Sequence, residues 1–196
     1  MARYGKAHKE ATRRRIIERA GRRFKRDGID GSGITIIMSD AGLTNGAFYA
    51  HFGSKEDLVA AVVGDELRRQ SERFGGGSLD RAGFEQFVRD YLSTAHRDHP
   101  EVGCPSAALL DEIVRSADAT KRTYTDGVLA MIDGVATLLG TPDPEVARAR
   151  VLSIFASMVG TLQLSRALTD QALADEVLVA GIENVLVLLD RHVAVS

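Results

Sequence analysis

The segment from Thr44 to Lys55 concentrates side chains that can form hydrogen bonds with a nucleic acid. Asn45 carries an amide that can pair bidentately with adenine, and the methyl groups of Thr44 and Ala47 can contact thymine. Gly46, which lacks a side chain, allows close approach to a groove wall. A phenol, an imidazole and an ammonium group follow at Tyr49, His51 and Lys55. A protein core needs none of these polar groups, so DNA is the best explanation for them.

The apolar residues around this segment predict three helices and the start of a fourth. The first covers about residues 12–27 and ends at Gly28, and the second lies between a Ser32 cap and Gly42. The third begins after a Thr44 cap, directs Phe48 and Phe52 to the core and stops at Gly53. The sequence from Ser54 to Asp57 resembles a capping box and starts a helix that runs to about residue 74. Two short helices joined by the Gly42 turn form a helix-turn-helix.

Positive charge is concentrated at the N-terminus. Residues 1–26 hold eleven Lys or Arg and two Glu, a formal charge of +9, whereas the remaining residues carry −11. This asymmetry indicates an electrostatic footprint for a polyanion, and Arg3, Lys6 and Arg13 could reach phosphates or the minor groove. The alternative is a solvated helix face with Glu–Arg pairs four residues apart.

Every segment after the flexible sequence Gly75–Ser78 has helical periodicity. Asp80, Pro105 and Asp143 mark helix starts, Pro100 closes one region, and Gly140 ends another helix. Neither strand alternation nor an internal repeat is evident. The predicted fold class is all-α with about nine helices: a helix-turn-helix domain over 1–54, a connecting helix over about 55–74 and a larger domain over 79–196.

At residues 12–63 the chain resembles the DNA-binding domain of the TetR family of bacterial transcriptional regulators. The resemblance rests on Ala41-Gly-Leu-Thr44, on Gly46-Ala-Phe-Tyr-Ala-His-Phe52 and on Gly53-Ser-Lys-Glu-Asp-Leu58. It implies that Tyr49 and Lys55 hold phosphates, with His51 near the backbone. The family usually places Thr or Ser at the position of Gly33, so Ser32 or Thr35 is expected to supply that phosphate contact here.

The resemblance also implies a C-terminal domain that dimerises and binds a small, mostly apolar effector. Palindromic half-sites normally require two copies of a helix-turn-helix, so we expect a homodimer. Its interface is predicted on the two last helices, at Val151, Phe155, Met158, Val185 and Leu189. The effector pocket is predicted among the middle helices, at Phe87, Tyr91, Cys104, Tyr124 and Met131, although each of these could be plain core.

Cys104 is the one cysteine, which excludes an internal disulfide framework and a cysteine-based zinc site. It precedes a helix start, where a thiolate would be stabilised, so a redox- or electrophile-sensing regulator is one alternative and an inert buried thiol another. A more remote alternative is an all-α interaction module without DNA binding.

The sequence does not predict an enzyme, a metal site or a cofactor. The five histidines form no ligand motif, and neither a nucleotide loop nor a catalytic triad is present. The N-terminus lacks a signal peptide and no apolar run could span a bilayer, so we expect a cytoplasmic location. The favoured function is a repressor that binds a palindromic operator and is released by its effector.

Overall fold

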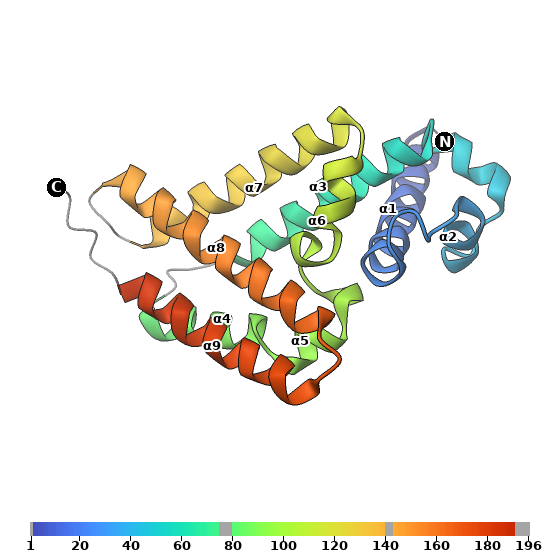
Figure 1. Cartoon of the computed structure of the whole chain (residues 1–196). Coiled ribbons are helices and arrows are strands. Elements are labelled where there is room, and N and C mark those ends of the chain that lie inside the picture. Colours follow the sequence, from blue (N-terminus) through green and yellow to red (C-terminus); the bar gives the residue numbers. More distant parts are fainter. Residues whose placement is uncertain (1, 75–79, 140–142, 191–196) are drawn as a thin grey trace. The chain divides into compact units, whose positions relative to one another are not determined.

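The computed structural model describes residues 2–74, 80–139 and 143–190, and all regular elements in these ranges are helical (Figure 1). The α-helices are α1 (Ala2–Asp27), α2 (Ile34–Asp40), α3 (Lys55–Phe74), α4 (Arg81–Tyr91), α5 (Thr94–Asp98), α6 (Pro105–Arg115), α7 (Asp118–Leu138), α8 (Pro144–Ala167) and α9 (Gln171–Asp190). Two 3-10 helices, η1 (Asn45–Ala50) and η2 (Pro100–Val102), complete the described part. The all-α prediction is confirmed.

The chain forms two compact units, each made of two stretches of sequence. The first unit comprises residues 1–69 and 101–127, and the second comprises residues 70–100 and 128–196. Helices α3 and α7 contribute to both units. This division differs from a boundary near residue 79, because α6 packs against α1 and therefore belongs to the N-terminal unit.

The core of the first unit lies between α1, α2, η1 and α3. Its largest fully buried side chains are Ile16, Phe24, Ile37, Met38, Phe48, Leu58 and Leu67. Lys25 of α1 is also buried, and its Nζ lies 2.7 Å from Glu66 Oε2 of α3 and 3.1 Å from the Gly103 carbonyl oxygen. The pairing satisfies a charge that would be costly to bury alone.

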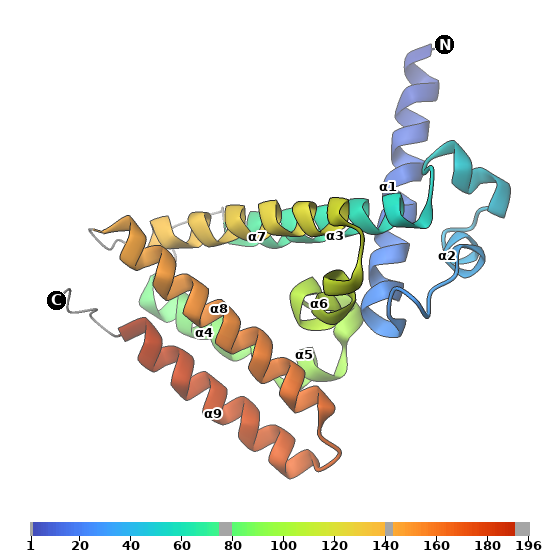
Figure 2. The same cartoon turned by 45° about the horizontal axis from the view of Figure 1, so that its top comes forward.

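The second unit is built on the antiparallel pair α8 and α9, which lie side by side in Figures 1 and 2. A Cβ atom at Gly181 would overlap the Thr161 side chain, so glycine is what permits this close approach. Ser165 Oγ donates to the Ala174 carbonyl oxygen at 3.0 Å near the turn between the two helices. The pair therefore forms a tightly packed hairpin.

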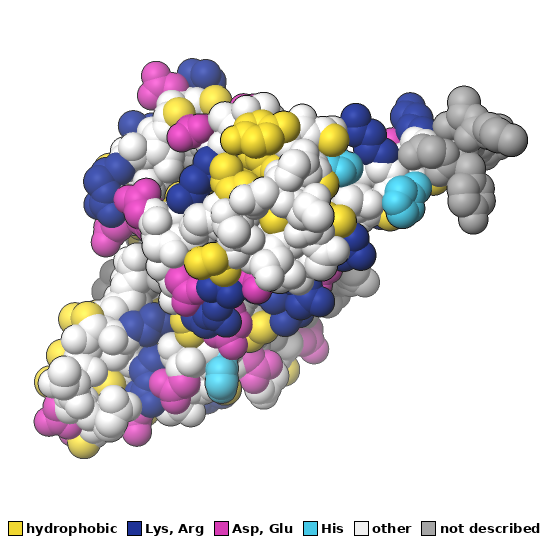
Figure 3. Space-filling model, turned by 90° about the vertical axis from the view of Figure 1, so that its right-hand side faces the viewer, with side chains coloured by type: hydrophobic (Ala, Val, Ile, Leu, Met, Phe, Trp, Pro, Cys, Tyr) yellow, Lys and Arg dark blue, Asp and Glu magenta, His cyan; other side chains and the backbone are white. Residues whose placement is uncertain are grey.

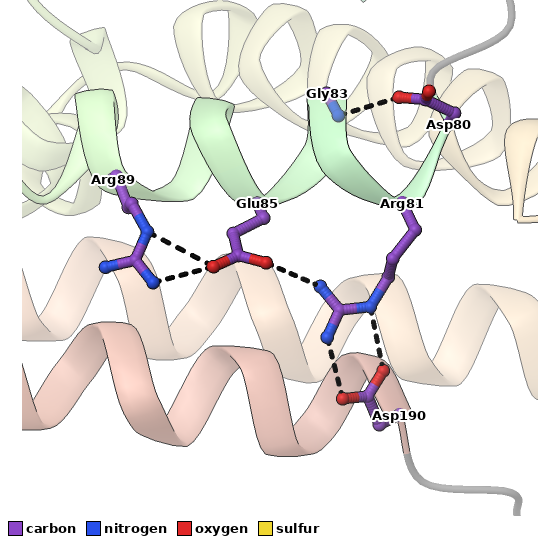
Figure 4. A network of polar contacts seen from close by, with 6 residues as sticks. All are labelled: Asp80, Arg81, Gly83, Glu85, Arg89 and Asp190. Carbon is purple, nitrogen blue, oxygen red and sulfur yellow. Dashed lines mark hydrogen bonds and ion pairs between the residues drawn. The ribbon is translucent and has the colours of Figure 1, made fainter.

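Ion pairs join α4 to the end of α9 (Figure 4). Arg81 makes a two-pronged contact with Asp190, with distances of 2.9 and 2.7 Å, and Glu85 bridges Arg81 and Arg89. Asp80 caps α4 by accepting from the Gly83 amide at 2.7 Å. These contacts fix the start of α4 on α9.

Most predicted helix boundaries are confirmed, and the exceptions have local causes. Asp80 and Asp143 cap their helices through their side chains, and Ser54 Oγ accepts from the Asp57 amide. The Ser32 cap was wrong: Gly33 occupies the cap position, and the Ser32 hydroxyl turns back to donate to the Gly28 carbonyl oxygen at 2.7 Å.

Three other boundaries also differ from the sequence-based prediction. Helix α1 begins at Ala2 rather than near residue 12. Helix α4 ends at Tyr91 and is followed by the separate helix α5, and Pro100, which was expected to close this region, opens the short helix η2. The predicted break at Gly75–Ser78 and the helix end at Gly140 lie outside the described residues. Of the described helices, none has the length and apolar character that crossing a bilayer requires.

Candidate nucleic-acid interface

The helix-turn-helix is formed by α2, a glycine turn and η1. Gly42 has a φ of +67°, a left-handed conformation that favours glycine. The amides of Gly42 and Leu43 donate to the carbonyl oxygens of Ser39 and Met38, both at 2.9 Å, which ends α2 as a Schellman turn. The segment after it is a 3-10 helix, shorter than the helix that the sequence predicted.

Phenylalanine side chains anchor η1 to the core. Phe48 is fully buried, and its ring centroid lies 5.6 Å from that of Phe52. The Tyr49 ring meets Phe48 edge-on at 5.2 Å, yet the tyrosine side of the helix faces outward and Tyr49 is 70% exposed. Burial of the two phenylalanines therefore presents Tyr49 to the surface.

The start of η1 is exposed together with part of α2. Thr44, Asn45, Gly46 and Thr35 are exposed, and Ala47 is half-buried. Asn45 Nδ2 donates to Thr35 Oγ1 at 2.8 Å, which links the two helices across their outer face. The side-chain oxygen Oδ1 of Asn45 and the second N–H of its Nδ2 take no part in that bond. The side-chain amide therefore keeps one acceptor and one donor, the pair that adenine requires.

Two predicted contact residues are directed into the protein. Ser32 is fully buried, so its hydroxyl is not available to a phosphate, and of the two alternatives only Thr35 is exposed. Lys55 is half-buried, and its Nζ donates to the Ile29 carbonyl oxygen at 2.6 Å. The lysine thus holds the turn before α2 and keeps two of its three N–H groups for other partners.

His51 follows η1 and is half-buried. Its Nδ1 atom is buried and has no hydrogen-bond partner among the described residues. Burial lowers the pKa of His51 below its ordinary value of 6.5, and the positive charges of Lys9 and Arg13 lower it further. The imidazole is therefore neutral near pH 7.

Helix α1 supplies the positive charge beside this surface. Lys6, Lys9 and Arg13 are exposed, and the Arg13 guanidinium lies over the Phe52 ring, 4.9 Å from its centroid. Figure 3 shows Lys, Arg and His side chains on the projecting part of this face. The side chain of Arg3 lies outside the described part. Toward its other end, α1 pairs its arginines with acids, as in the 2.6 Å contact from Arg23 to Asp40.

Sequence reasoning missed two features of the first unit. Ile36 of α2, an apolar residue, is 46% exposed next to Thr35. Glu112 of α6 contacts the turn before α2 through bonds to the amides of Ile29 and Asp30. No local sequence pattern could have revealed a contact across more than eighty residues.

The predicted effector residues are divided between the two units. In the second unit the ring centroids of Phe87 and Tyr91 lie 6.0 Å apart with the rings tilted by 50°, and Met131 is buried. In the first unit Tyr124 Oη donates to Ser106 Oγ at 2.9 Å, and Cys104 is buried with 6% of its surface exposed. Burial is the first cause of a raised pKa for Tyr124. The described part of each unit has a cavity of about 200 Å³. None of the five predicted residues is among those that line these two cavities.

The cavity of the first unit lies beside Ile29, Lys55, Glu112 and Arg115. That of the second is lined mainly by apolar side chains, with acidic and basic groups, and includes Phe84, Val135, Leu138, Arg150 and Leu189. The Nε atom of Arg150 is buried and lacks a hydrogen-bond partner within the described ranges.

The predicted dimer residues differ in their burial within the protomer. Val151, Met158 and Val185 are buried within the protomer, so they cannot form its outer surface, and Phe155 and Leu189 are half-buried. The exposed faces of α8 and α9 instead carry Leu152, Leu164, Val179 and Val187. Because α8 is apolar almost all round, its periodicity could not tell which side faces the core.

Together the fold and the interface define an all-helical protein with a helix-turn-helix near its N-terminus. Residues 16–62 match the family described as bacterial regulatory proteins, tetR family. HTH-type transcriptional regulator TtgR from Pseudomonas putida is 38% identical over 78 residues, 37% of this chain and 37% of TtgR. HTH-type transcriptional repressor SCO4008 from Streptomyces coelicolor is 32% identical over 93 residues, 47% of this chain and 46% of that protein.

The chain spans less than half the length of these curated relatives, whereas structural similarity covers nearly all of it. A TetR transcriptional regulator from Chloroflexus aurantiacus J-10-FL has a TM-score of 0.68 and 25% identity, covering 95% of this chain and 98% of that one. Residues 16–62 thus match the DNA-binding domain of the tetR family of bacterial regulatory proteins, and the chain shares its fold with a solved TetR transcriptional regulator.

Proposed function

We propose that this protein is a transcriptional repressor that binds a palindromic DNA operator as a homodimer and is released by a small effector. The observation that carries the proposal is the outer face of the helix-turn-helix. Tyr49 is 70% exposed there, Asn45 and Thr35 form a hydrogen-bonded pair, and the basic helix α1 lies in the same unit. Such a surface suits base edges flanked by phosphates.

The DNA contacts divide by chemistry. Thr35, the Tyr49 hydroxyl and the remaining N–H groups of Lys55 contact phosphates, with His51 close to the backbone. Thr44, Asn45 and Ala47 reach bases, and Gly46 allows the approach. The exposed basic side chains of α1, including Lys6 and Arg13, supply further phosphate contacts. The repressor assignment is supported by the similarity to SCO4008, which is a transcriptional repressor.

The first test is selection of a binding sequence from a random duplex library, followed by titration. We expect a palindromic sequence to be enriched and its affinity to fall steeply with salt concentration, because phosphate contacts release counterions. Tyr49→Phe removes one hydroxyl and should weaken binding of all duplexes by about tenfold, the equivalent of ~1.4 kcal/mol. Tyr124→Phe, which removes the hydroxyl that donates to Ser106 Oγ in α6, is the matched control and should leave binding close to wild type. Selection that enriches no sequence, or salt-independent binding, would contradict the proposal.

The dimer surface is assigned to the exposed side of α8 and α9. Ala156 and Gly160 lie between Leu152 and Leu164 along α8, and all four positions are exposed and uncharged. Small residues between larger apolar ones allow two helices to approach closely. On α9 Val179 and Val187 are also exposed, on either side of the exposed Glu183. A two-fold arrangement would bury the surface and present two helix-turn-helix motifs to one duplex.

The effector is assigned to the cavity of the second unit. Phe84, Val135 and Leu138 supply an apolar wall, and Arg150 supplies a buried Nε–H that has no acceptor within the described ranges. A buried donor of this kind normally has a partner. A small carboxylic acid with an apolar body would satisfy both features. The thiol-sensing alternative is not favoured, since Cys104 is only 6% exposed.

A further inference from the structure

Charged side chains from two other helices hold the turn between α1 and α2. Glu112 Oε1 of α6 accepts hydrogen bonds from the Ile29 amide at 2.8 Å and the Asp30 amide at 3.2 Å. From α3, Lys55 Nζ donates to the Ile29 carbonyl oxygen at 2.6 Å. We call this arrangement, Glu112 and Lys55 on residues 28–32, the turn clamp.

The backbone of the turn is shaped to accept the carboxylate. Gly28 has a φ of +81°, and a Cβ atom at this position would lie 3.1 Å from Glu112 Oε1. Glycine therefore allows both the left-handed turn that ends α1 and the close approach of Glu112. Ile29 is buried, so its amide depends on this carboxylate rather than on bulk water.

The turn leads directly into the DNA-binding elements. Gly33, the cap of α2, follows it, and α2 carries Thr35, the partner of Asn45. Helix α6 is anchored independently of Glu112, because Leu109 and Ile113 are buried. A change in the position of α6 would thus move the amides of the turn, and with them the start of α2.

We propose that Glu112 is a positioning residue for DNA binding: it holds the turn before α2 and couples the position of α6 to the helix-turn-helix. This inference rests on the proposed function. Glu112 itself contacts no DNA and acts through the amides of Ile29 and Asp30. Two consecutive amides donate charge-assisted hydrogen bonds to the same carboxylate oxygen, which ties the turn to α6.

Three variants separate positioning from general stability. Glu112→Ala removes the acceptor, Glu112→Gln keeps an uncharged one, and Asp111→Asn makes the same charge change at the neighbouring exposed position. Residue-resolved amide exchange is measured for Ile29 and Asp30, with the α8–α9 hairpin as an internal reference. Affinity is titrated with a duplex selected by the wild-type protein, at several salt concentrations.

In Glu112→Ala we expect exchange of the Ile29 and Asp30 amides to rise about tenfold, with exchange in α8 and α9 unchanged. Affinity for the selected duplex should fall about tenfold with an unchanged salt slope, because no phosphate contact is removed. Glu112→Gln should recover part of both losses, and Asp111→Asn should match wild type in both.

Several results would overturn the proposal. Faster exchange with unchanged affinity would show that the turn is clamped but does not control DNA binding. Unchanged exchange in both Glu112 variants would show that the carboxylate does not hold the turn. If the wild-type protein bound no duplex, the proposed function would fail and the coupling with it, whereas the exchange data would still report on the clamp by itself.

Discussion

At the scale of single residues, the hydrogen bond between Asn45 and Thr35 directs the proposed base contact. Because Thr35 Oγ1 accepts one N–H of Asn45, the amide plane is fixed by a neighbour on α2 rather than by η1 alone. This orientation comes from a contact ten residues apart in sequence. Thr35 thus has a second role besides the phosphate contact that we propose for it.

We predict that Asn45→Ala abolishes discrimination at one base pair, a loss of about 1–3 kcal/mol for a bidentate contact. Thr35→Val keeps the shape but removes the acceptor, and should relax discrimination at that same base pair. Thr35→Ser, which retains a hydroxyl, should stay close to wild type. Base preference is measured by titrating single-substitution duplexes. If Asn45→Ala kept the wild-type profile, the base contact would be wrong.

His51 gives a prediction on pH. Its pKa in the free protein is lowered, chiefly by burial and then by Lys9 and Arg13, and a nearby DNA phosphate would raise it. A pKa that is higher in the complex strengthens binding at low pH, and the gain disappears as pH rises through the pKa of the complex. Affinity should therefore increase as pH falls from about 8 to about 6 at fixed ionic strength.

The control for His51 is the other histidine of the basic region. His51→Gln should lose this pH dependence, while His8→Gln, at an exposed position of α1, should keep it. Equal pH profiles for wild type and His51→Gln would rule out the phosphate role. Since the pKa is lowered in the folded state, protonation also destabilises the fold below about pH 6.5, so unfolding is monitored over the same range.

At the scale of elements, the helix pair α8 and α9 has an inner and an outer apolar side. The inner side, with Val151, Met158 and Val185, packs within the protomer. The outer side, with Leu152, Leu164, Val179 and Val187, remains exposed. On α8 the exposed row Leu152, Ala156, Gly160 and Leu164 is uncharged, and exposed apolar residues gathered in this way are typical of an interaction surface.

We predict that Leu164→Asp weakens dimerisation at least tenfold, because it places a charge on that apolar face. Val114→Asp makes the same change at another exposed apolar position, in α6, and should leave the dimer intact. Sedimentation equilibrium of both variants measures the dissociation constant. A monomeric wild-type protein, or a Leu164→Asp variant with unchanged association, would contradict the assigned dimer surface.

At the scale of the whole molecule, two compact units share the long helices α3 and α7. The proposed DNA contacts belong to the first unit, and the proposed effector cavity belongs to the second. An effector shifts DNA binding only if it binds one state of the protein more tightly than the other.

We predict that octanoate, a probe with one carboxylate and an apolar chain, binds in the cavity of the second unit. Bound octanoate should lower the affinity of the protein for the selected duplex. Arg150→Met should weaken octanoate binding about tenfold. Arg148→Met, two residues away and exposed with its guanidinium 3.0 Å from Asp133, is the matched control. Isothermal titration with octanoate and with octanol separates the carboxylate contribution. Equal effects of the two arginine variants would remove Arg150 from the effector site.

The sequence by itself determined the helical fold class, most helix starts and the position of the helix-turn-helix. These features depend on local chemistry: side-chain caps such as Asp80 and Asp143, a left-handed glycine at position 42 and apolar residues at helical spacing. The exposed side chains of η1 follow from the same pattern, because Phe48 and Phe52 must be buried and Tyr49 then faces outward.

Only the tertiary structure decided which partners distant residues choose. The bond from Lys55 to Ile29 and the contact of Glu112 with the turn both join segments that are not adjacent in sequence. The same holds for the inner side of α8, where apolar residues surround the helix. Helical periodicity reports which residues share a face, but the neighbouring helices determine whether that face is buried.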